Sequence, residues 1–293
     1  HGSKTIQADK FSLKELFEKS AHIPFDDREN PFASIEDISM NLIKEHLYEV
    51  KSRLYDVCDT RDKKDIAQDM KLLYGPDENL RPRNIALLMF SEKINDYFPY
   101  ARIEFADIPD PTGRNMSERT FSGPLQNQLR SAIEYIKNSV IEEKIRKTDN
   151  EIITVRTLNY PIDAIKELLA NAIYHRSYQV SEPITVINTP EYIEIRSFPG
   201  LDRSISAEMI EALNIRSTGE YRNRRIGNFL KELGLTEGRN TGIPRAIEAL
   251  DDNGNPNPLF ITDPERRSLT VRILINPAFT SSTVSIPSSI KNM

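Results

Sequence analysis

Three polar side chains lie four residues apart in the stretch "AIKELLANAIYHRSYQ", residues 164–179: Glu167, Asn171 and His175. On an α-helix, residues four apart lie one above the other, so these three would form a polar ridge. A carboxylate one turn before a carboxamide suits a metal-nucleotide site, because the amide oxygen of Asn171 can bind Mg²⁺ while Glu167 polarises water as a general base. Both residue types are also common on solvent-facing helices, and this alternative stays open for the pair alone.

The remaining residues of this stretch indicate how the helix is placed. Its apolar residues lie largely on the opposite side and would face a sheet: Ile165, Leu168, Leu169, Ala172 and Ile173. His175 could titrate near neutrality, but no nucleophile or obvious carboxylate pairs with it in the sequence. A structural or phosphate-facing role for His175 is therefore favoured over catalysis.

A second candidate feature is "NTGIP", residues 240–244, where Gly242 precedes Ile243 and Pro244 at the start of an apolar-periodic helix. The free backbone amides of a helix start favour a phosphate, and glycine lets the backbone approach closely. A plain Thr-Gly turn into a helix with proline near its first position is the alternative. Between the two features, the basic run "RNRR" at 222–225 predicts either a phosphate or DNA contact or a solvated helix start.

The elements of the second half predict a mixed sheet with helices. A long helix is expected over 123–147, a strand over 151–160, a hairpin from "PITVINT" and "YIEIRSF", three helices at 206–213, 223–233 and 243–250, and a closing strand "SLTVRILI". This order is not the strict alternation of a doubly wound parallel fold, and neither common glycine-rich phosphate loop occurs. We expect an α+β fold, a mixed α/β sandwich.

The first 120 residues predict a mixed helical and strand region without a chemical motif of its own. Helices are expected near 9–20, in 34–54, in "DIAQDMKLL" and in "RPRNIALLMFSEK", and a strand in "YARIEFADI". The Pro- and Gly-containing segment 107–123 predicts a loop or domain junction, and 277–293 a flexible tail.

Composition limits the classes of protein. The chain has 293 residues and a formal net charge of −5, so only a local patch could attract DNA. Its apolar runs are too short for a membrane helix and no signal peptide is apparent, which predicts a cytoplasmic protein. The single Cys58 and four histidines give no zinc-type spacing. The start "HGSKT", without methionine, indicates a fragment.

The stretches "KELLANAIYHRSYQ", "YIEIRSFPGLD" and "NRRIGNFLKELGLTEGRNTGIPRAIEAL" together resemble a divergent branch of the histidine-kinase, gyrase and mismatch-repair ATPases, the Bergerat fold. The resemblance is to the HATPase-like domain of bacterial transcriptional regulators related to a RecG helicase C-terminal region, in which a Schlafen-type, Alba-like domain believed to bind DNA comes first. It implies a remnant of the Alba-like domain at 1–30, a connecting region at 31–122 and the HATPase-like domain at 123–276.

The resemblance also implies roles for individual residues. Glu167 would be the general base and Asn171 the Mg²⁺ ligand, whereas Thr241, Gly242 and Ile243 would contact phosphates. Segment 201–240 would form a lid over the nucleotide, and Arg239 is a candidate phosphate partner because a guanidinium binds phosphate oxygens in pairs.

The sequence departs from the ATPases at the end of the strand "EIRSFPGLD". Ser197 stands where the adenine-reading aspartate would be, and only Gly200 remains of the glycines that follow. A hydroxyl can accept from the adenine amino group, but with less strength than a carboxylate.

The leading hypothesis is a transcriptional regulator in which binding of ATP and Mg²⁺ is coupled to binding of DNA through the N-terminal part, with a homodimer as the expected assembly. At most it would be a slow ATPase that uses Glu167. The alternative hypothesis is a degenerate Bergerat scaffold that binds no nucleotide and serves dimerisation or partner binding.

Overall fold

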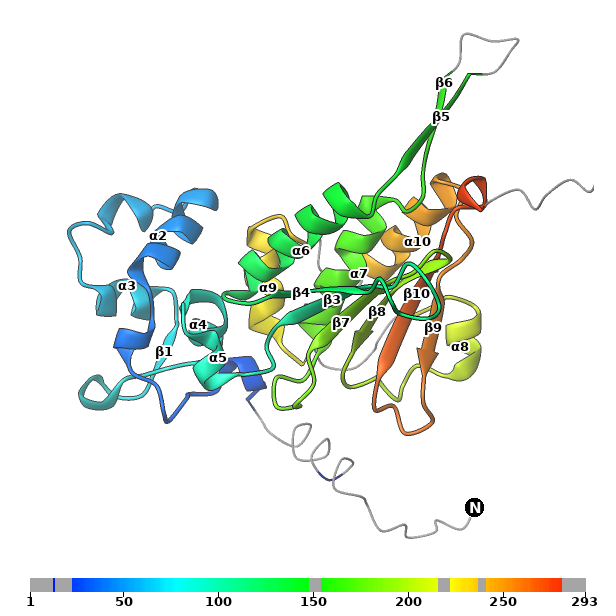
Figure 1. Ribbon diagram of the computed structural model, residues 1–293. Coiled ribbons are helices and arrows are strands. Elements are labelled where there is room, and N and C mark those ends of the chain that lie inside the picture. Colours follow the sequence, from blue (N-terminus) through cyan, green and yellow to red (C-terminus); the bar gives the residue numbers. More distant parts are fainter. Residues whose placement is uncertain (1–12, 14–22, 148–153, 216–221, 237–240, 281–293) are drawn as a thin grey trace, which may run out of the picture.

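The computed structural model describes residue 13 and residues 23–147, 154–215, 222–236 and 241–280. These residues form an α+β fold, as predicted, in which helices pack on one face of a mixed six-stranded sheet (Figure 1). The expected helix near 9–20 lies outside the described residues except for Leu13. Across the described ranges, every helix is too short or too polar to cross a lipid bilayer.

The N-terminal region contains short helices around a small buried centre. The structure has α2 at Met40–Glu49, α3 at Lys63–Asp69, α4 at Asn84–Phe90 and α5 at Ile94–Tyr97, with the two-residue strands β1 at Leu73–Tyr74 and β2 at Arg81–Pro82. All seven residues of α4, "NIALLMF", are buried. This apolar helix is therefore enclosed on every side by the rest of the molecule.

The sheet has the strand order β4–β3–β7–β8–β10–β9. Its strands are β3 at Ile103–Asp107, β4 at Ser117–Phe121, β7 at Ile184–Asn188, β8 at Tyr192–Ser197, β9 at Leu259–Thr262 and β10 at Leu269–Leu274. Only the β3–β7 pair is parallel. The predicted hairpin is confirmed as β7 and β8, and the closing strand as β10.

The helices of the second half are α6 at Leu125–Ser139, α7 at Ile162–His175, α8 at Ala207–Glu211, α9 at Arg224–Glu232 and α10 at Gly242–Asp252. Figure 1 shows α6, α7 and α10 together on one face of the sheet. Every second side chain along these strands points toward the helices and is buried. These side chains are Ile103, Phe105, Ile184, Val186, Ile193, Ile195, Val271 and Ile273. The helix with the Glu167 and Asn171 ridge is thus held between a sheet and two other helices.

Some expected elements are wrong in part. The segment 107–123, predicted as a loop, contains strand β4. The helix predicted over 123–147 ends at Ser139, and Glu143–Lys147 forms β5, which pairs with β6 at Thr154–Leu158 in a projecting hairpin (Figure 1). Asn159 fixes this change of direction: its Oδ1 accepts from the Glu142 amide at 2.9 Å and its Nδ2 donates to the Val140 carbonyl at 2.8 Å. These bonds take the place of the next helical turn.

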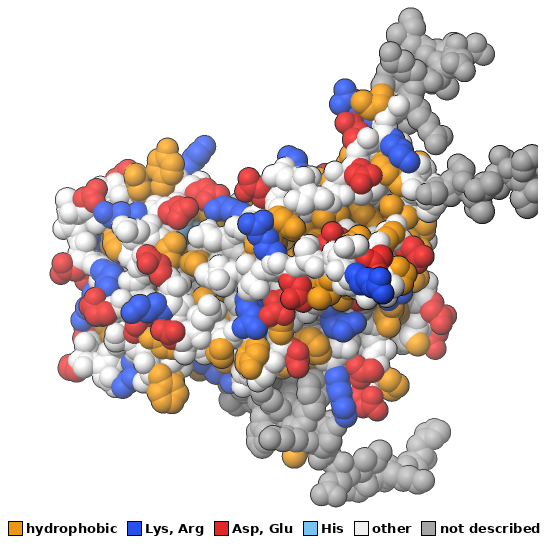
Figure 2. All heavy atoms as spheres, in the orientation of Figure 1, with side chains coloured by type: hydrophobic (Ala, Val, Ile, Leu, Met, Phe, Trp, Pro, Cys, Tyr) orange, Lys and Arg blue, Asp and Glu red, His pale blue; other side chains and the backbone are white. Residues whose placement is uncertain are grey.

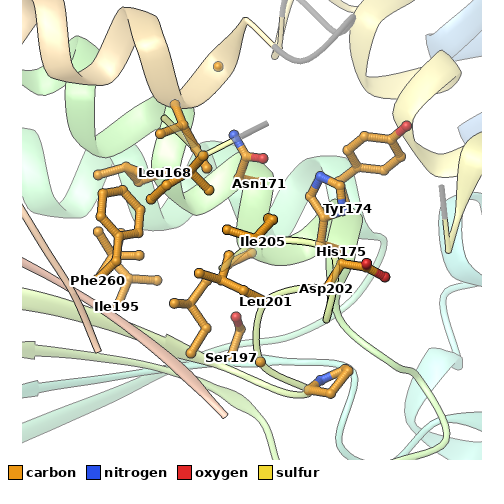
Figure 3. Close-up of a pocket in the computed structure, with 18 of the residues that line it drawn as sticks. Leu168, Asn171, Tyr174, His175, Ile195, Ser197, Leu201, Asp202, Ile205 and Phe260 are labelled. Atoms are coloured by element: carbon orange, nitrogen blue, oxygen red, sulfur yellow. The ribbon is translucent and has the colours of Figure 1, made fainter. Parts of the chain in front are cut away.

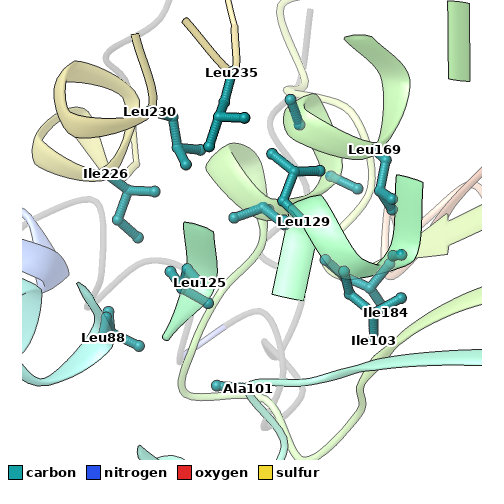
Figure 4. Packing of buried hydrophobic residues seen from close by; sticks show 14 of the residues in the cluster. Leu88, Ala101, Ile103, Leu125, Leu129, Leu169, Ile184, Ile226, Leu230 and Leu235 are labelled. Carbon is teal, nitrogen blue, oxygen red and sulfur yellow. The ribbon is translucent and has the colours of Figure 1, made fainter. Parts of the chain in front are cut away.

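A single hydrophobic core joins the two halves of the chain. Figure 4 shows Leu88 of α4, Ile226 and Leu230 of α9, and the α6 side chains beside them. The sheet also crosses the predicted boundary at 122/123, because β3 pairs with β7. The domain division stays a prediction, but both structural units that it separates contribute to one sheet and one core.

The two ends of the chain are described only in part. Residues 25–27 form a short 3₁₀ turn, whereas residues 1–12 and 14–22 of the predicted Alba-like remnant lie outside the described residues. Residues 277–279 form another 3₁₀ turn, and 281–293 of the predicted tail lie outside as well. On the face shown in Figure 2, described acidic and basic side chains are interspersed rather than gathered into a continuous basic surface.

Candidate functional site

Helix α7 places Glu167 and Asn171 one turn apart, as its sequence predicts. Glu167 is buried and Asn171 is half-buried. The Asn171 Nδ2 atom donates to the Glu167 carbonyl at 3.1 Å, a bond within the helix. The amide nitrogen of Asn171 is used locally, so its oxygen is the atom that can bind a cation or a ligand.

The start of α10 packs directly on this ridge. A Cβ atom added at Gly242 would lie 2.5 Å from the Asn171 Nδ2 and 3.0 Å from the Glu167 Oε2. Glycine is therefore the residue that lets α10 begin here, and the first-turn amides of that helix come beside Asn171. The two features that the sequence placed seventy residues apart meet in space.

A cavity of about 140 Å³ lies next to this meeting point, between α7, the sheet and segment 201–215. Figure 3 shows apolar side chains at one end, among them Leu168 and Phe260, and polar side chains at the other. The apolar lining includes Leu168, Ile195, Leu201, Ile205, Ile215 and Phe260, and the polar lining includes Asn171, Tyr174, His175, Asp202, Arg222 and Thr236. Leu201, Ile205 and Ile215 come from the described part of the predicted lid segment 201–240 and line the cavity.

The polar lining includes a carboxylate, a guanidinium and an imidazole: Asp202, Arg222 and His175. Desolvation of the His175 ring and, to a lesser degree, the positive charge of Arg222 lower the pKa of its imidazole. His175 is therefore neutral at pH 7 and can offer hydrogen bonds but not a positive charge. Arg222 carries the positive charge among these three side chains.

The end of strand β8 forms the floor of the cavity. Ser197 is its last residue and lines the cavity, followed by a cis peptide bond between Phe198 and Pro199. Gly200 also lines the cavity, and its amide donates to the Arg266 carbonyl at 2.8 Å. A Cβ at Gly200 would lie 2.6 Å from the Thr262 Oγ1, so this glycine allows close packing against the β9–β10 hairpin.

The structure brings most of the predicted site residues together. Asn171, Ser197, Gly200, Gly242 and Ile243 all line the cavity. Glu167 lies behind Gly242 rather than on the lining, and Thr241 is an exposed residue just before α10. Arg239 lies outside the described residues.

Sequence reasoning did not select Asp202 and left Arg222 undecided. Asp202 follows the Pro-Gly turn and lies five residues after Ser197. A comparison that aligns the end of this strand with the end of the ATPase strand therefore does not reach it. The basic run 222–225 gave a signal, but its sequence could not tell which arginine faces the cavity. His175, Asp202 and Arg222 come from three separate segments of the chain and line one cavity in the folded molecule.

Comparisons with known proteins address this part of the chain. Residues 182–273 match the family model described as "Putative ATP-dependent DNA helicase recG C-terminal". This match supports an ATPase-like domain. It begins after α7, so Glu167 and Asn171 precede the matched range, whereas Ser197, Arg222 and Gly242 lie within it.

A solved structure has a similar fold. The crystal structure of the DIP2311 protein from Corynebacterium diphtheriae superposes with a TM-score of 0.64 over 89% of this chain, at 16% sequence identity. The match covers 49% of that protein, so the chain spans about half of its length. At this identity the similarity shows the fold alone. No curated protein matches the chain.

Proposed function

We propose that the cavity binds an adenine nucleotide with Mg²⁺, and that the chain is the nucleotide-responsive part of a bacterial transcriptional regulator. The observation that carries this proposal is the meeting of Asn171, the start of α10 and an apolar slot at one cavity. A helix start favours phosphate, a carboxamide oxygen suits Mg²⁺, and an apolar slot takes a flat base. The match to an ATPase-like family model agrees with this assignment.

The size of the cavity requires the lid to move. A volume of about 140 Å³ is smaller than a nucleotide needs, since ligand pockets usually measure about 300–1,000 Å³. Leu201, Ile205 and Ile215 occupy the side where space would open. In this proposal residues 201–215 move outward when the nucleotide binds.

The residues fit Mg²⁺ as part of a nucleotide complex rather than as a separate protein site. Among the described residues, no cluster of three or more His, Cys, Asp or Glu side chains could hold a metal ion. Mg²⁺ commonly binds through one or two protein oxygens and the phosphates of its nucleotide, which is what Asn171 would permit. Glu167 would act as base in at most a slow hydrolysis, because it lies behind Gly242.

Calorimetric titration with the magnesium complex of a non-hydrolysable ATP analogue tests the proposal. The wild type should bind, and Asn171→Ala should bind at least about tenfold more weakly, because the amide oxygen is lost. Asn138→Ala, an exposed residue at the end of α6, is the matched control and should bind like the wild type. Absence of binding by the wild type, or equal binding by the Asn171 variant, would contradict the proposal.

A degenerate scaffold is the second candidate. It is favoured by the direct packing of Gly242 on Asn171 and by Ser197 in the place of the adenine-reading aspartate. In that case the chain would serve dimerisation or partner binding. Absence of binding in the titration above, with a dimer in sedimentation, would support this alternative.

Binding of DNA, assembly as a homodimer and a cytoplasmic location belong to the same proposal. The matching family model carries the name of a DNA helicase region, and the net charge of −5 requires any DNA contact to be local. We assign that contact to the N-terminal part of the protein. Nucleotide and DNA affinities measured on one full-length preparation must change each other by the same factor if the two sites are coupled.

A further inference from the structure

The basic run 222–225 is divided by the fold into four different environments. Arg222 lines the cavity, Asn223 is fully buried, Arg224 is exposed, and Arg225 contacts the N-terminal region. The four residues are adjacent in sequence, so the position of Arg225 limits where Arg222 can lie. The turn before α9 therefore connects the cavity with a part of the molecule some 200 residues away in sequence.

Asn223 attaches this turn to the end of α7. Its Nδ2 donates to the Tyr174 carbonyl at 2.9 Å and to the Arg176 carbonyl at 2.7 Å. Gly227, one turn later, packs against the Tyr174 ring so closely that a Cβ atom would lie 2.5 Å from the ring. The carbonyls at the end of α7 are the groups that a helix leaves without internal partners, and Asn223 satisfies two of them.

Asp26 attaches the same turn to the N-terminal region. Its carboxylate is fully buried, and its Oδ2 accepts from the amides of Arg225 at 2.7 Å and Ile226 at 3.0 Å. A carboxylate at this position satisfies the first amides of α9 and complements the positive end of the helix. Asp26 thus caps a helix that begins 198 residues after it.

The guanidinium of Arg225 adds three contacts to this attachment. It pairs with Asp27 at 2.8 Å and donates to the carbonyls of Met70 and Lys71, both at 3.1 Å. Further along α9, the Phe229 ring packs edge-on against His46 at 5.1 Å between ring centroids. The N-terminal region therefore fixes α9 through its first turn and through its apolar face.

The geometry points to Arg222 as the residue that binds the phosphates of the cavity's ligand, with Asp26 as a positioning residue that sets where Arg222 lies. This inference rests on the proposed nucleotide binding. A guanidinium binds phosphate oxygens in pairs, and Arg222 lines the same cavity as the start of α10. Asp202 lines that cavity too, so loss of Arg222 would leave an acidic surface that repels phosphate.

Two ligands separate the phosphate contact from binding of the base. The magnesium complex of adenylyl imidodiphosphate carries the phosphates, and adenosine does not. Arg222→Gln in the 293-residue chain should weaken binding of the analogue at least about tenfold and leave adenosine unchanged. Arg224→Gln, the exposed neighbour on α9, is the matched control and should leave both affinities unchanged.

Asp26 is tested with a pair of variants. Asp26→Ala removes the acceptor from the start of α9 and should weaken analogue binding several-fold with adenosine unchanged, whereas Asp26→Asn keeps an acceptor oxygen and should restore most of the affinity. A purely structural role would weaken both ligands together. If Asp26→Ala does not fold, the Arg222→Gln measurement alone decides the phosphate contact, and Asp26→Asn with wild-type affinity supports the cap.

The outcomes distinguish this inference from the proposed function. If the wild type binds neither ligand, the proposed function fails. If the wild type binds the analogue and Arg222→Gln binds it equally well, nucleotide binding stands and the role of Arg222 is wrong. Equal weakening of analogue and adenosine by Asp26→Ala would overturn its role as a positioning residue.

Discussion

Gly242 determines, at the scale of single residues, how closely α10 approaches α7. A methyl group at this position would meet the Asn171 Nδ2 at 2.5 Å, closer than any real contact. Gly242→Ala should therefore lower the free energy of unfolding by about 1–3 kcal/mol, the usual cost of overpacking a buried site. Urea unfolding measures this change, and Glu248→Ala on the exposed side of α10 is the control. Equal stability of both variants would show that the Asn171 side chain or α10 moves aside at little cost.

Some residues of the cavity could be predicted from the sequence and others could not. Glu167 and Asn171 were predictable because the helical period places them on one ridge. Gly242 was predictable because the apolar pattern of a helix begins directly after it. Asp202 was not, because its place in the cavity depends on the turn after β8 rather than on spacing along an element. Arg222 and Arg225 look alike in sequence and differ only in what α9 packs against.

At the scale of elements, Asn159 decides where α6 gives way to the β5–β6 hairpin. It is buried, bonds to the backbone of Val140 and Glu142, and also accepts from the Tyr160 amide at 2.8 Å. Asn159→Ala would leave these three backbone groups unpaired, so the free energy of unfolding should fall by at least about 2 kcal/mol. Denaturant unfolding checks this, with the exposed Asn138→Ala as the control. A loss no larger than that of the control would contradict this role.

Strands whose own residues alternate between apolar and polar were predicted. Strands that are defined only by their hydrogen bonds to a neighbouring strand were not. The strands β7, β8 and β10 alternate apolar and polar residues, and their hydrogen bonds agree with that pattern. Strand β4 is polar along most of its length and lies at the edge of the sheet, where only its pairing with β3 makes it a strand. The same holds for β5, whose charged residues also suit a helix end.

At the scale of the whole molecule, the contact between the N-terminal region and α9 contains two buried groups with opposite responses to pH. Burial raises the pKa of Asp26 from 3.8 to about 6, although the amides of Ile226 and Arg225 oppose it. Burial lowers the pKa of His46 from 6.5 to about 4. The stabilising contribution of Asp26 is thus complete below pH 3.8 and is lost as the pH rises to about 6, whereas that of His46 is complete above pH 6.5 and is lost as the pH falls to about 4.

These two contributions are of similar size, so they should nearly cancel in the wild type. Asp26→Asn removes the pH-dependent contribution of Asp26 and leaves that of His46. At about 1.4 kcal/mol for each unit of pKa, the free energy of unfolding of this variant should rise by about 3 kcal/mol from pH 4 to pH 6.5 relative to the wild type. His46→Gln should show the opposite slope, because Asp26 then titrates without the opposing contribution of His46, and Glu232, whose pKa is also raised by burial, acts in the same direction as Asp26. Urea unfolding at several pH values across this range measures all three slopes. Parallel slopes for the wild type and both variants would mean that neither group senses its burial in this contact, and that the N-terminal region is held to α9 by the aromatic rings and Arg225 alone.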